Sequence, residues 1–313
     1  MRNHFARKIT EWAEKDERIV LLSGDIGNRL FDKFKERCPG RFYNCGVAEA
    51  NMVGMAAGLA TQGFRPVCYT IAPFLTYRAM EQIRVDLGYH HLPVVLVGTG
   101  GGLAYASLGG THHSCEELGM LRLIPGMTVA APADAMELES VLDDALRGKS
   151  TAYIRIGKKG EPVVHPKPPK FKKGEPIRLA RGKDVALVSC GTVLPEVIQA
   201  ADLLKKKGIS ASVYSQPYLK PFADKPWAEI FRTHRYVVSI EEHSRLGGLG
   251  GCLAEWRAGQ EKGAVLVRLG VPDEFLHRTM DQEEARKESG FDAAGICRAL
   301  KNAVRPRSER KAA

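Results

Sequence analysis

The sequence lacks the features that mark membrane-spanning, secreted and zinc-binding proteins. No apolar run approaches the roughly 18 residues that a membrane-spanning helix needs, and the opening MRNHFARK contains no apolar segment of a secretory signal. The seven cysteines are scattered without a Cys-x-x-Cys pair, which argues against a disulfide framework or a zinc site. We therefore expect a cytoplasmic protein with no membrane segment and no metal ligands of its own.

The sequence also has little net charge outside two short segments. It contains 46 Lys and Arg against 36 Asp and Glu, a net charge of +10. Residues 157–183 contribute +7 and residues 304–313 contribute +3, so the remainder carries 33 basic and 33 acidic side chains. A basic nucleic-acid-binding module is the non-enzymatic alternative, but such modules interleave aromatic with basic residues, and these basic segments contain few aromatics. We expect no nucleic-acid partner.

The basic segment 157–183 divides the chain. It holds five of the 17 prolines, and dense proline favours an extended chain and blocks helices. This composition indicates a solvated linker, with a basic docking strip for an acidic partner or a phosphorylated ligand as the alternative. The expected organisation is a first domain at 1–156, the linker at 157–183, a smaller domain at 184–303 and a disordered basic tail at 304–313.

Both domains alternate short apolar runs with amphipathic stretches. Runs of this kind are typical of strands that are covered on both faces, and their alternation with helices predicts parallel sheets. The expected fold class is therefore α/β, with two parallel-sheet domains. The expected strands are 19–22, 66–71, 93–97, 127–131, 152–156, 185–189, 210–214, 236–240 and 265–269. The expected helices are 29–37, 50–61, 74–87, 133–147, 194–207 and 250–259.

One carboxylate, Glu49, stands alone among small and apolar residues. Gly54 and Gly58 lie four residues apart, so they share one helical face and allow another backbone to approach closely. Because glycine costs a helix about 1 kcal/mol relative to alanine, the pair favours tight packing. A buried carboxylate is costly unless it has a partner, so Glu49 either caps its helix or handles a proton at a subunit contact.

Two aromatic residues, Phe74 and Tyr77, follow one strand later and share one side of a helix start. Such a pair either belongs to the core or stacks on a flat heteroaromatic ring. Asp25 follows the first strand, where it either lines a crevice or forms a turn.

A glycine-rich loop, GTGGGLAYASLGG at residues 98–110, follows another buried strand. It matches neither GxxxxGK[ST] nor GxGxxG, which excludes the usual nucleotide fingerprints. The loop lies where ligands bind in parallel sheets, at the carboxyl ends of the strands, and it runs into His112 and His113. Adjacent histidines point in different directions, so one histidine facing a polar site is a better interpretation than a two-histidine metal site.

The ordered motifs extend over residues 5–300 and are specific together rather than singly. They are Gly46-Val-Ala-Glu-Ala-Asn-Met, Phe74-Leu-Thr-Tyr, Gly110-Thr-His-His and Ala130-Ala-Pro-Ala-Asp, then Ser189-Cys-Gly-Thr-Val-Leu-Pro-Glu and Glu241-Glu-His-Ser-Arg-Leu-Gly-Gly. The first four resemble the pyrimidine-binding domain of the transketolase family, which uses thiamine diphosphate. The last two resemble the C-terminal domain of that family.

This resemblance implies roles around the cofactor. Glu49 corresponds to a glutamate that hydrogen-bonds the aminopyrimidine ring. Protonation of a ring nitrogen favours the imino tautomer, whose neighbouring nitrogen removes the thiazolium C2 proton. By the same resemblance, Phe74 and Tyr77 line the pyrimidine and Asp25 lies near the thiazolium.

The resemblance also implies roles around the substrate. His112, with His113 beside it, corresponds to a histidine that reaches substrate oxygens and shuttles protons. Arg155 falls near an arginine that holds a sugar phosphate.

The sequence departs from full-length members of the family in two ways. Those members begin with a diphosphate-binding domain that carries a Gly-Asp-Gly segment and an Asn for the metal, and this sequence has no such segment. We therefore expect half a site, completed by an N-terminal transketolase subunit that holds Mg²⁺ and the diphosphate in an α2β2 assembly. In addition, Thr99-Gly100 and Leu108 replace a usual His-Asp pair and an acidic residue, which predicts altered contacts to substrate hydroxyls.

We predict the C-terminal subunit of a split transketolase, a transferase that is active only with its partner. It would move a two-carbon ketol unit from a ketose to an aldose, with sugar phosphates as the expected substrates. The enzymatic alternatives are the β chain of a 2-oxo acid dehydrogenase-like complex and a 1-deoxyxylulose-5-phosphate synthase-like enzyme. A regulatory paralogue without activity is a further alternative.

Overall fold

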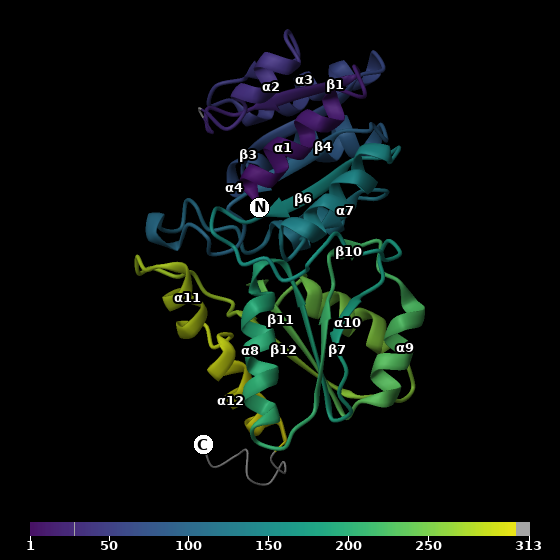
Figure 1. Ribbon diagram of the computed structural model, residues 1–313, viewed down its shortest axis with the longest axis vertical. Helices are drawn as coiled ribbons and strands as arrows, with labels where there is room; N and C mark the ends of the chain where they lie inside the picture. Colours follow the sequence, from purple (N-terminus) through teal and green to yellow (C-terminus); the bar gives the residue numbers. More distant parts are fainter. Residues whose placement is uncertain (28, 305–313) are drawn as a thin grey trace.

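The computed structural model of the chain describes residues 1–27 and 29–304, so the expected tail from residue 305 onward lies outside the described residues. The chain folds into two α/β units, one above the other in Figure 1. Each unit is built on a mostly parallel sheet. The expected fold class, α/β with two parallel-sheet domains, is confirmed.

The first sheet has the strand order β10-β5-β6-β4-β3-β1-β2 within the described residues, and every pairing is parallel except that of β10. Every residue of β1, β4 and β6 is buried, as unbroken apolar runs predict for strands covered on both faces. The strands are β1 (Ile19–Ser23), β2 (Phe42–Asn44), β3 (Arg65–Ile71), β4 (Val95–Thr99), β5 (Thr128–Ala130), β6 (Ala152–Ile156) and β10 (Tyr218–Lys220).

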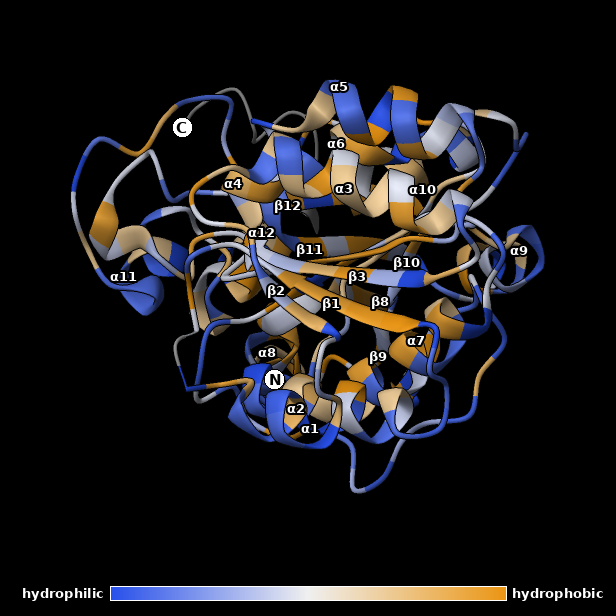
Figure 2. Cartoon of the chain, turned by 90° about the horizontal axis from the view of Figure 1, so that it is seen from above, coloured by the Kyte–Doolittle hydropathy of each residue, from blue (hydrophilic) through white to orange (hydrophobic). Residues whose placement is uncertain are grey.

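Two layers of helices cover this sheet, as Figure 2 shows from above. One face packs against α1 (Arg2–Ala13), α2 (Asp32–Arg37) and α7 (Ala135–Arg147). The other face packs against α3 (Glu49–Thr61), α6 (Glu117–Arg122) and the π-helix η1 (Ile83–Tyr89). Alternate strand residues enter the two cores, for example Leu21 on one side and Leu22 on the other.

The second sheet has the order β12-β11-β8-β9-β7, with β7 antiparallel. Its helices lie on both faces, α8 and α12 on one and α9 and α10 on the other. The strands are β7 (Ile177–Ala180), β8 (Val185–Cys190), β9 (Ala211–Ser215), β11 (Tyr236–Ser244) and β12 (Val265–Val271). The helices are α8 (Leu194–Lys205), α9 (Asp224–Thr233), α10 (Leu249–Ala258), α11 (Gln282–Glu288) and α12 (Ala293–Val304).

The expected single helix over 74–87 is wrong. The chain forms three short pieces, α4 (Ala72–Thr76), α5 (Met80–Gln82) and η1. Ala79 leaves helical geometry with φ −109° and ψ 19°, and η1 then widens to the i→i+5 pattern that defines a π-helix. The apolar pattern predicted burial correctly, since Ile83 and Leu87 are fully buried.

The basic segment 157–183, which was expected to be a solvated linker, is attached to both α/β units. Its end forms β7, which pairs with β9 of the second sheet. Its middle is held against the first unit, because the backbone N–H groups of Val164 and His165 both donate to Asp134 at 2.7 Å. Nδ1 of His165 also lies 3.2 Å from Oδ2 of Asp134, and Phe171 packs against the core of the first unit, so the run is anchored although its charge predicts solvation.

No helix in the described part of the chain is long and apolar enough to cross a membrane.

Candidate functional site

The residues predicted to form a site follow three neighbouring strands of the first sheet. Asp25 follows β1, α4 with Phe74 follows β3, and the glycine loop that leads to His112 follows β4. Because the carboxyl ends of parallel strands meet at one edge of a sheet, the topology gathers these segments. Glu49 reaches the same edge as the first residue of α3, which follows β2.

Glu49 is buried, with 4% of its surface exposed. Its Oε2 accepts a hydrogen bond from Nη1 of Arg78 at 3.1 Å. Among the described residues no side-chain hydrogen bond caps the N-terminus of α3, which argues against the capping alternative for Glu49. Within the described residues Oε1 of Glu49 has no hydrogen-bond partner, which leaves one oxygen of this buried side chain for a ligand.

Arg78 connects Glu49 to the predicted aromatic wall. Its guanidinium carbon lies 4.4 Å from the ring centroid of Phe74, a cation–π contact. The ring of Phe74 meets the imidazole of His112 edge to face, with centroids 5.0 Å apart. Glu49, Arg78, Phe74 and His112 therefore form one contiguous line of contacts, although they come from three separate segments.

His112 is half-buried on the loop after β4. Burial, assisted by the neighbouring His113, lowers the pKa of His112 from its ordinary value. Its Nδ1 shares a hydrogen bond with Oγ1 of Thr111 at 2.9 Å. A neutral imidazole at neutral pH can accept a proton, so this environment suits the predicted proton shuttle.

The line of contacts continues beyond His112 to a cation. The ring of Tyr105 lies 6.0 Å from that of His112, and Nζ of Lys158 lies 4.6 Å from the Tyr105 centroid. Lys158 has no ion-pair partner among the described residues. An anionic group on a ligand that reaches past His112 would meet this ammonium.

Tyr77 and Asp25 contact other residues than those of this line. The hydroxyl of Tyr77 donates to Glu116, and burial raises the pKa of Tyr77, so the phenol stays protonated. Asp25 is exposed and its Oδ1 accepts from Nδ2 of Asn44 at 3.0 Å. Nε2 of His113 is buried without a hydrogen-bond partner among the described atoms.

Contacts within the fold occupy the side chain of Arg155. It is buried on β6 and forms a two-point ion pair with Glu117, at 2.5 Å and 2.7 Å. It also donates to the carbonyls of Ser114 and Glu242. Four of its five N–H groups are thus occupied, so the geometry argues against the expected phosphate contact, because the guanidinium is already neutralised.

Three residues in this arrangement escaped sequence reasoning. Arg78 and Lys158 look like ordinary surface cations in the sequence. The role of Arg78 depends on its contact with Glu49, 29 positions away, and that of Lys158 on its contact with Tyr105, 53 positions away. Tyr105 is the one aromatic within the glycine loop, and this could have indicated its role.

The expectation of tight packing at Gly54 and Gly58 is wrong within this chain, since a Cβ at either would meet no described atom within 4 Å.

The donor set fits a heteroaromatic ring better than a metal. A buried carboxylate with a spare oxygen can hydrogen-bond a ring nitrogen, and Phe74 offers a flat apolar face nearby. Among the described residues no three His, Cys, Asp or Glu side chains are grouped closely enough to hold a metal ion. The residues therefore fit the aminopyrimidine of thiamine diphosphate.

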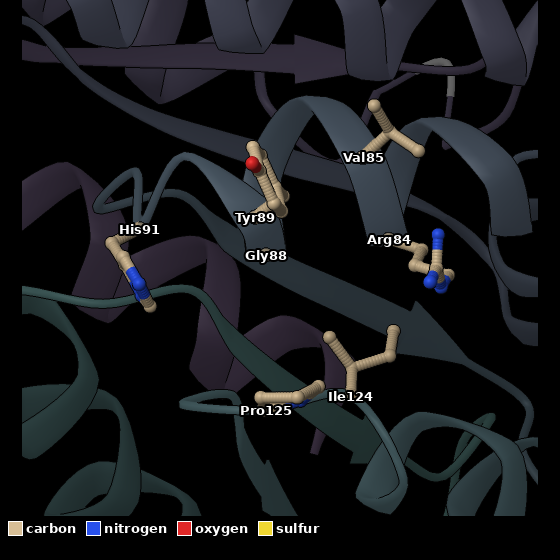
Figure 3. A pocket seen from close by; sticks show the side chains of 7 residues that line it. All are labelled: Arg84, Val85, Gly88, Tyr89, His91, Ile124 and Pro125. Carbon is tan, nitrogen blue, oxygen red and sulfur yellow. The ribbon is translucent and has the colours of Figure 1, made fainter.

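A separate surface pocket of about 440 Å³ lies between η1 and the segment at 124–125 (Figure 3). It is lined by Arg84, Val85, Gly88, Tyr89, His91, Ile124 and Pro125, and contains none of the predicted site residues. Tyr89 is 78% exposed beside it. This pocket is therefore separate from the line of contacts between Glu49 and Lys158.

Two family models match the chain. One, described as transketolase, pyrimidine binding domain, matches residues 1–161. The other, described as transketolase, C-terminal domain, matches residues 174–296. Together they account for both α/β units.

Individual relatives agree with these matches. A putative transketolase C-terminal section from Methanocaldococcus jannaschii is 33% identical over 303 residues, which is 96% of this chain and 95% of that protein. A 1-deoxy-D-xylulose-5-phosphate synthase from an Anaeromyxobacter species is 37% identical over an alignment of 318 positions, which covers 99% of this chain and 49% of that protein. A solved structure described as a split gene transketolase, inactive beta4 tetramer, covers 97% of both chains with a TM-score of 0.87 and 32% identity.

Proposed function

The chain belongs to the transketolase family, and we propose that it is the C-terminal, pyrimidine-binding subunit of a two-chain, thiamine diphosphate-dependent transketolase that transfers a two-carbon ketol unit from a ketose to an aldose. The observation that carries this proposal is the buried Glu49, whose free oxygen heads a line of contacts through Arg78 and Phe74 to His112. A ring-binding carboxylate and a proton-accepting imidazole are the two groups that such a reaction requires of this chain.

Thiamine diphosphate, when bound, supplies a carbon nucleophile and stores the electron pair released by C–C cleavage. Glu49 would hold the aminopyrimidine by a hydrogen bond at Oε1 and keep a ring nitrogen protonated. Arg78 fixes the orientation of the carboxylate through Oε2, and Phe74 would shield one face of a bound pyrimidine from water. His112, kept neutral by its depressed pKa, would accept and return the proton of a substrate hydroxyl.

The substrates of this proposal are sugar phosphates. Support comes from Lys158, whose ammonium lies beyond His112 along the contact line and carries a charge that no described carboxylate neutralises. In this account Lys158 takes the role that Arg155 cannot fill, because Glu117 already occupies that guanidinium.

The partner in this proposal is an N-terminal transketolase subunit that holds Mg²⁺ and the diphosphate, in an α2β2 assembly in the cytoplasm. Support comes from the outer face of α3, where Gly54 and Gly58 are open and Met55 is 40% exposed. Val47, just before α3, is 75% exposed. Small and apolar residues left uncovered beside a buried carboxylate are expected where a second chain completes the site.

A 1-deoxyxylulose-5-phosphate synthase-like activity is the second candidate, favoured by the 37% identity to one such enzyme over nearly the whole chain. The experiment is to co-express the chain with a candidate diphosphate-binding subunit and to supply either a ketose phosphate with an aldose phosphate, or pyruvate with glyceraldehyde 3-phosphate. Consumption of the ketose phosphate supports the proposal. Consumption of pyruvate favours the second candidate, and robust ketol transfer by the chain alone contradicts the need for a partner.

A further inference from the structure

We propose that Glu242, at the end of β11 in the C-terminal domain, is the positioning residue that holds the glycine loop and thereby sets the place of His112. This inference rests on the proposed function for its catalytic consequence. Its structural part, a clamp between the two domains, stands on contacts within this chain alone.

The loop that carries His112 is closed at its base. Gly102 and Ser114 exchange both of their backbone hydrogen bonds at 2.9 Å, as an isolated antiparallel bridge. Residues 103–113 therefore project as a closed loop from one fixed point. A residue that fixes the Gly102–Ser114 bridge therefore also fixes the orientation of the loop and the position of His112 within it.

Glu242 binds the loop beside the Gly102–Ser114 bridge. Its Oε1 accepts the backbone N–H of Leu103 at 2.7 Å, and its main-chain carbonyl accepts Nη1 of Arg155 at 2.8 Å. Gly102 makes the close approach possible, because its φ is +66° and a Cβ there would lie 2.7 Å from Oε1 of Glu242. Glycine is thus the residue that this contact requires.

The carboxylate is itself fixed from the other side by the C-terminal domain. Gln282 donates to Oε1 at 2.8 Å, and Nε of Arg286 donates to Oε2 at 2.5 Å. Both donors belong to α11, and Glu242 is buried with 3% of its surface exposed. A buried carboxylate with three donors in fixed directions is a rigid anchor rather than a mobile contact.

Packing adds to the clamp. Leu103, Ala106 and Cys115 of the loop are buried in the same apolar cluster as Ile240 and Ala285 of the C-terminal domain. The backbone N–H of Ser244, two residues beyond Glu242, donates to the carbonyl of Cys115 at 2.7 Å. The C-terminal domain therefore holds both ends of the loop, and its role in this account is to keep His112 at the distance from Phe74 that the site needs.

The test compares two neighbouring buried carboxylates. Glu242→Gln replaces the carboxylate by an amide that cannot accept from Leu103, Gln282 and Arg286 together. The matched control is Glu241→Gln, because Glu241 is equally buried but accepts from Leu249 and Gly250 of its own domain. Gly102→Ala is a second variant, which pushes the loop away without removing a buried charge.

Amide hydrogen exchange at residues 103–113 is the structural readout, measured on the isolated full chain. We expect exchange at least tenfold faster in Glu242→Gln and Gly102→Ala, and unchanged in Glu241→Gln. Equal loop exchange in Glu242→Gln and Glu241→Gln would overturn the proposal. If the wild-type complex shows no ketol transfer, the proposed function fails while the exchange data still decide the clamp.

Kinetics of the reconstituted complex provide the second readout. We expect at least a tenfold loss of kcat in Glu242→Gln, because proton transfer depends on the place of His112. The KM for the donor sugar should change less than kcat. A faster-exchanging loop with unchanged kcat would show that Glu242 holds the loop without positioning the reaction, and would also overturn the proposal.

Discussion

The guanidinium of Arg155 and the carboxylate of Glu117 form a buried two-point ion pair, with Nε–Oε1 at 2.5 Å and Nη2–Oε2 at 2.7 Å. Burial alone would raise the pKa of Glu117, but Arg155 holds it below its ordinary value, so the pair is charged on both sides. It joins β6 to α6 beneath the glycine loop. This pair is therefore a structural element of the site.

Replacing one member of this pair should destabilise the fold strongly. In Glu117→Gln the guanidinium of Arg155 is left buried without a counter-charge, and breaking a buried pair costs about 3–5 kcal/mol. Thermal or urea unfolding of the isolated chain measures this loss. The double variant Glu117→Met with Arg155→Met should recover part of it, because no charge remains buried but the carbonyls of Ser114 and Glu242 lose their donor. A loss below about 1 kcal/mol in Glu117→Gln would contradict the pairing.

Lys158 should select for phosphorylated substrates. In Lys158→Ala the loss of a charge-assisted hydrogen bond, discounted for a partly exposed side chain, should raise the KM for a ketose phosphate about tenfold. The KM for the unphosphorylated sugar should not change. Lys159→Ala is the control, since Lys159 is exposed and adjacent. Equal effects of the two substitutions, or equal effects on both sugars, would remove Lys158 from the substrate site.

The attachment of the segment 157–183 should depend on pH through a buried cluster. Burial raises the pKa of Glu137 to about 7. Burial lowers the pKa of His165, but its hydrogen bond to Asp134 outweighs this, and the net shift is upward. Burial raises the pKa of Asp134, but His165 and several backbone N–H groups hold it at about 2.

The signs of these shifts define the pH window. Glu137 has a raised folded-state pKa, so its stabilisation is present at low pH and is lost as pH rises through about 7. The upward shift of the His165 pKa adds a loss of stability at pH values above the ordinary pKa of histidine. Asp134 contributes stability above its unfolded pKa, which is lost only as pH falls toward 2. The free energy of unfolding should therefore decline between pH 5 and 7, by up to about 1.4 kcal/mol per pH unit from Glu137.

Urea unfolding of the wild type and of Glu137→Gln across pH 5–8 measures this decline. The difference between the two proteins reports Glu137 together with its effect on His165, because Nε2 of His165 lies 3.5 Å from Oε1 of Glu137. We expect the variant to lose most of the decline and to keep the acid-side behaviour of Asp134. Parallel pH profiles for the two proteins would show that Glu137 ionises normally.

The central strands were predictable from sequence because burial on both faces leaves an unbroken apolar signature. The run at 152–156 coincides with β6, and 19–22 lies within β1. β10 was not predictable, since it leaves the second half of the chain to join the edge of the first sheet as three residues. Its pairing with β5 depends on tertiary packing that no local pattern records.

The residues of the candidate site also differ in whether a local sequence pattern or only a tertiary contact reveals them. Glu49 was predictable because a charge in an apolar segment is conspicuous, and His112 because it ends a glycine-rich loop. Arg78 and Lys158 were not, since a surface-type cation gives no sign of the group that it will contact. Glu117 was also missed, because its meaning depends on Arg155 lying opposite it on another element.

The most direct test of the account is the turnover of the reconstituted complex carrying Glu49→Gln. Glutamine keeps the size of the side chain but cannot hold a proton on the pyrimidine, so we expect kcat to fall by about 10²-fold or more. Glu81→Gln is the control, as an exposed carboxylate on the adjacent segment, and it should retain full activity, with an unchanged circular dichroism spectrum in both variants. Ketol transfer by Glu49→Gln within twofold of the wild type would contradict the account.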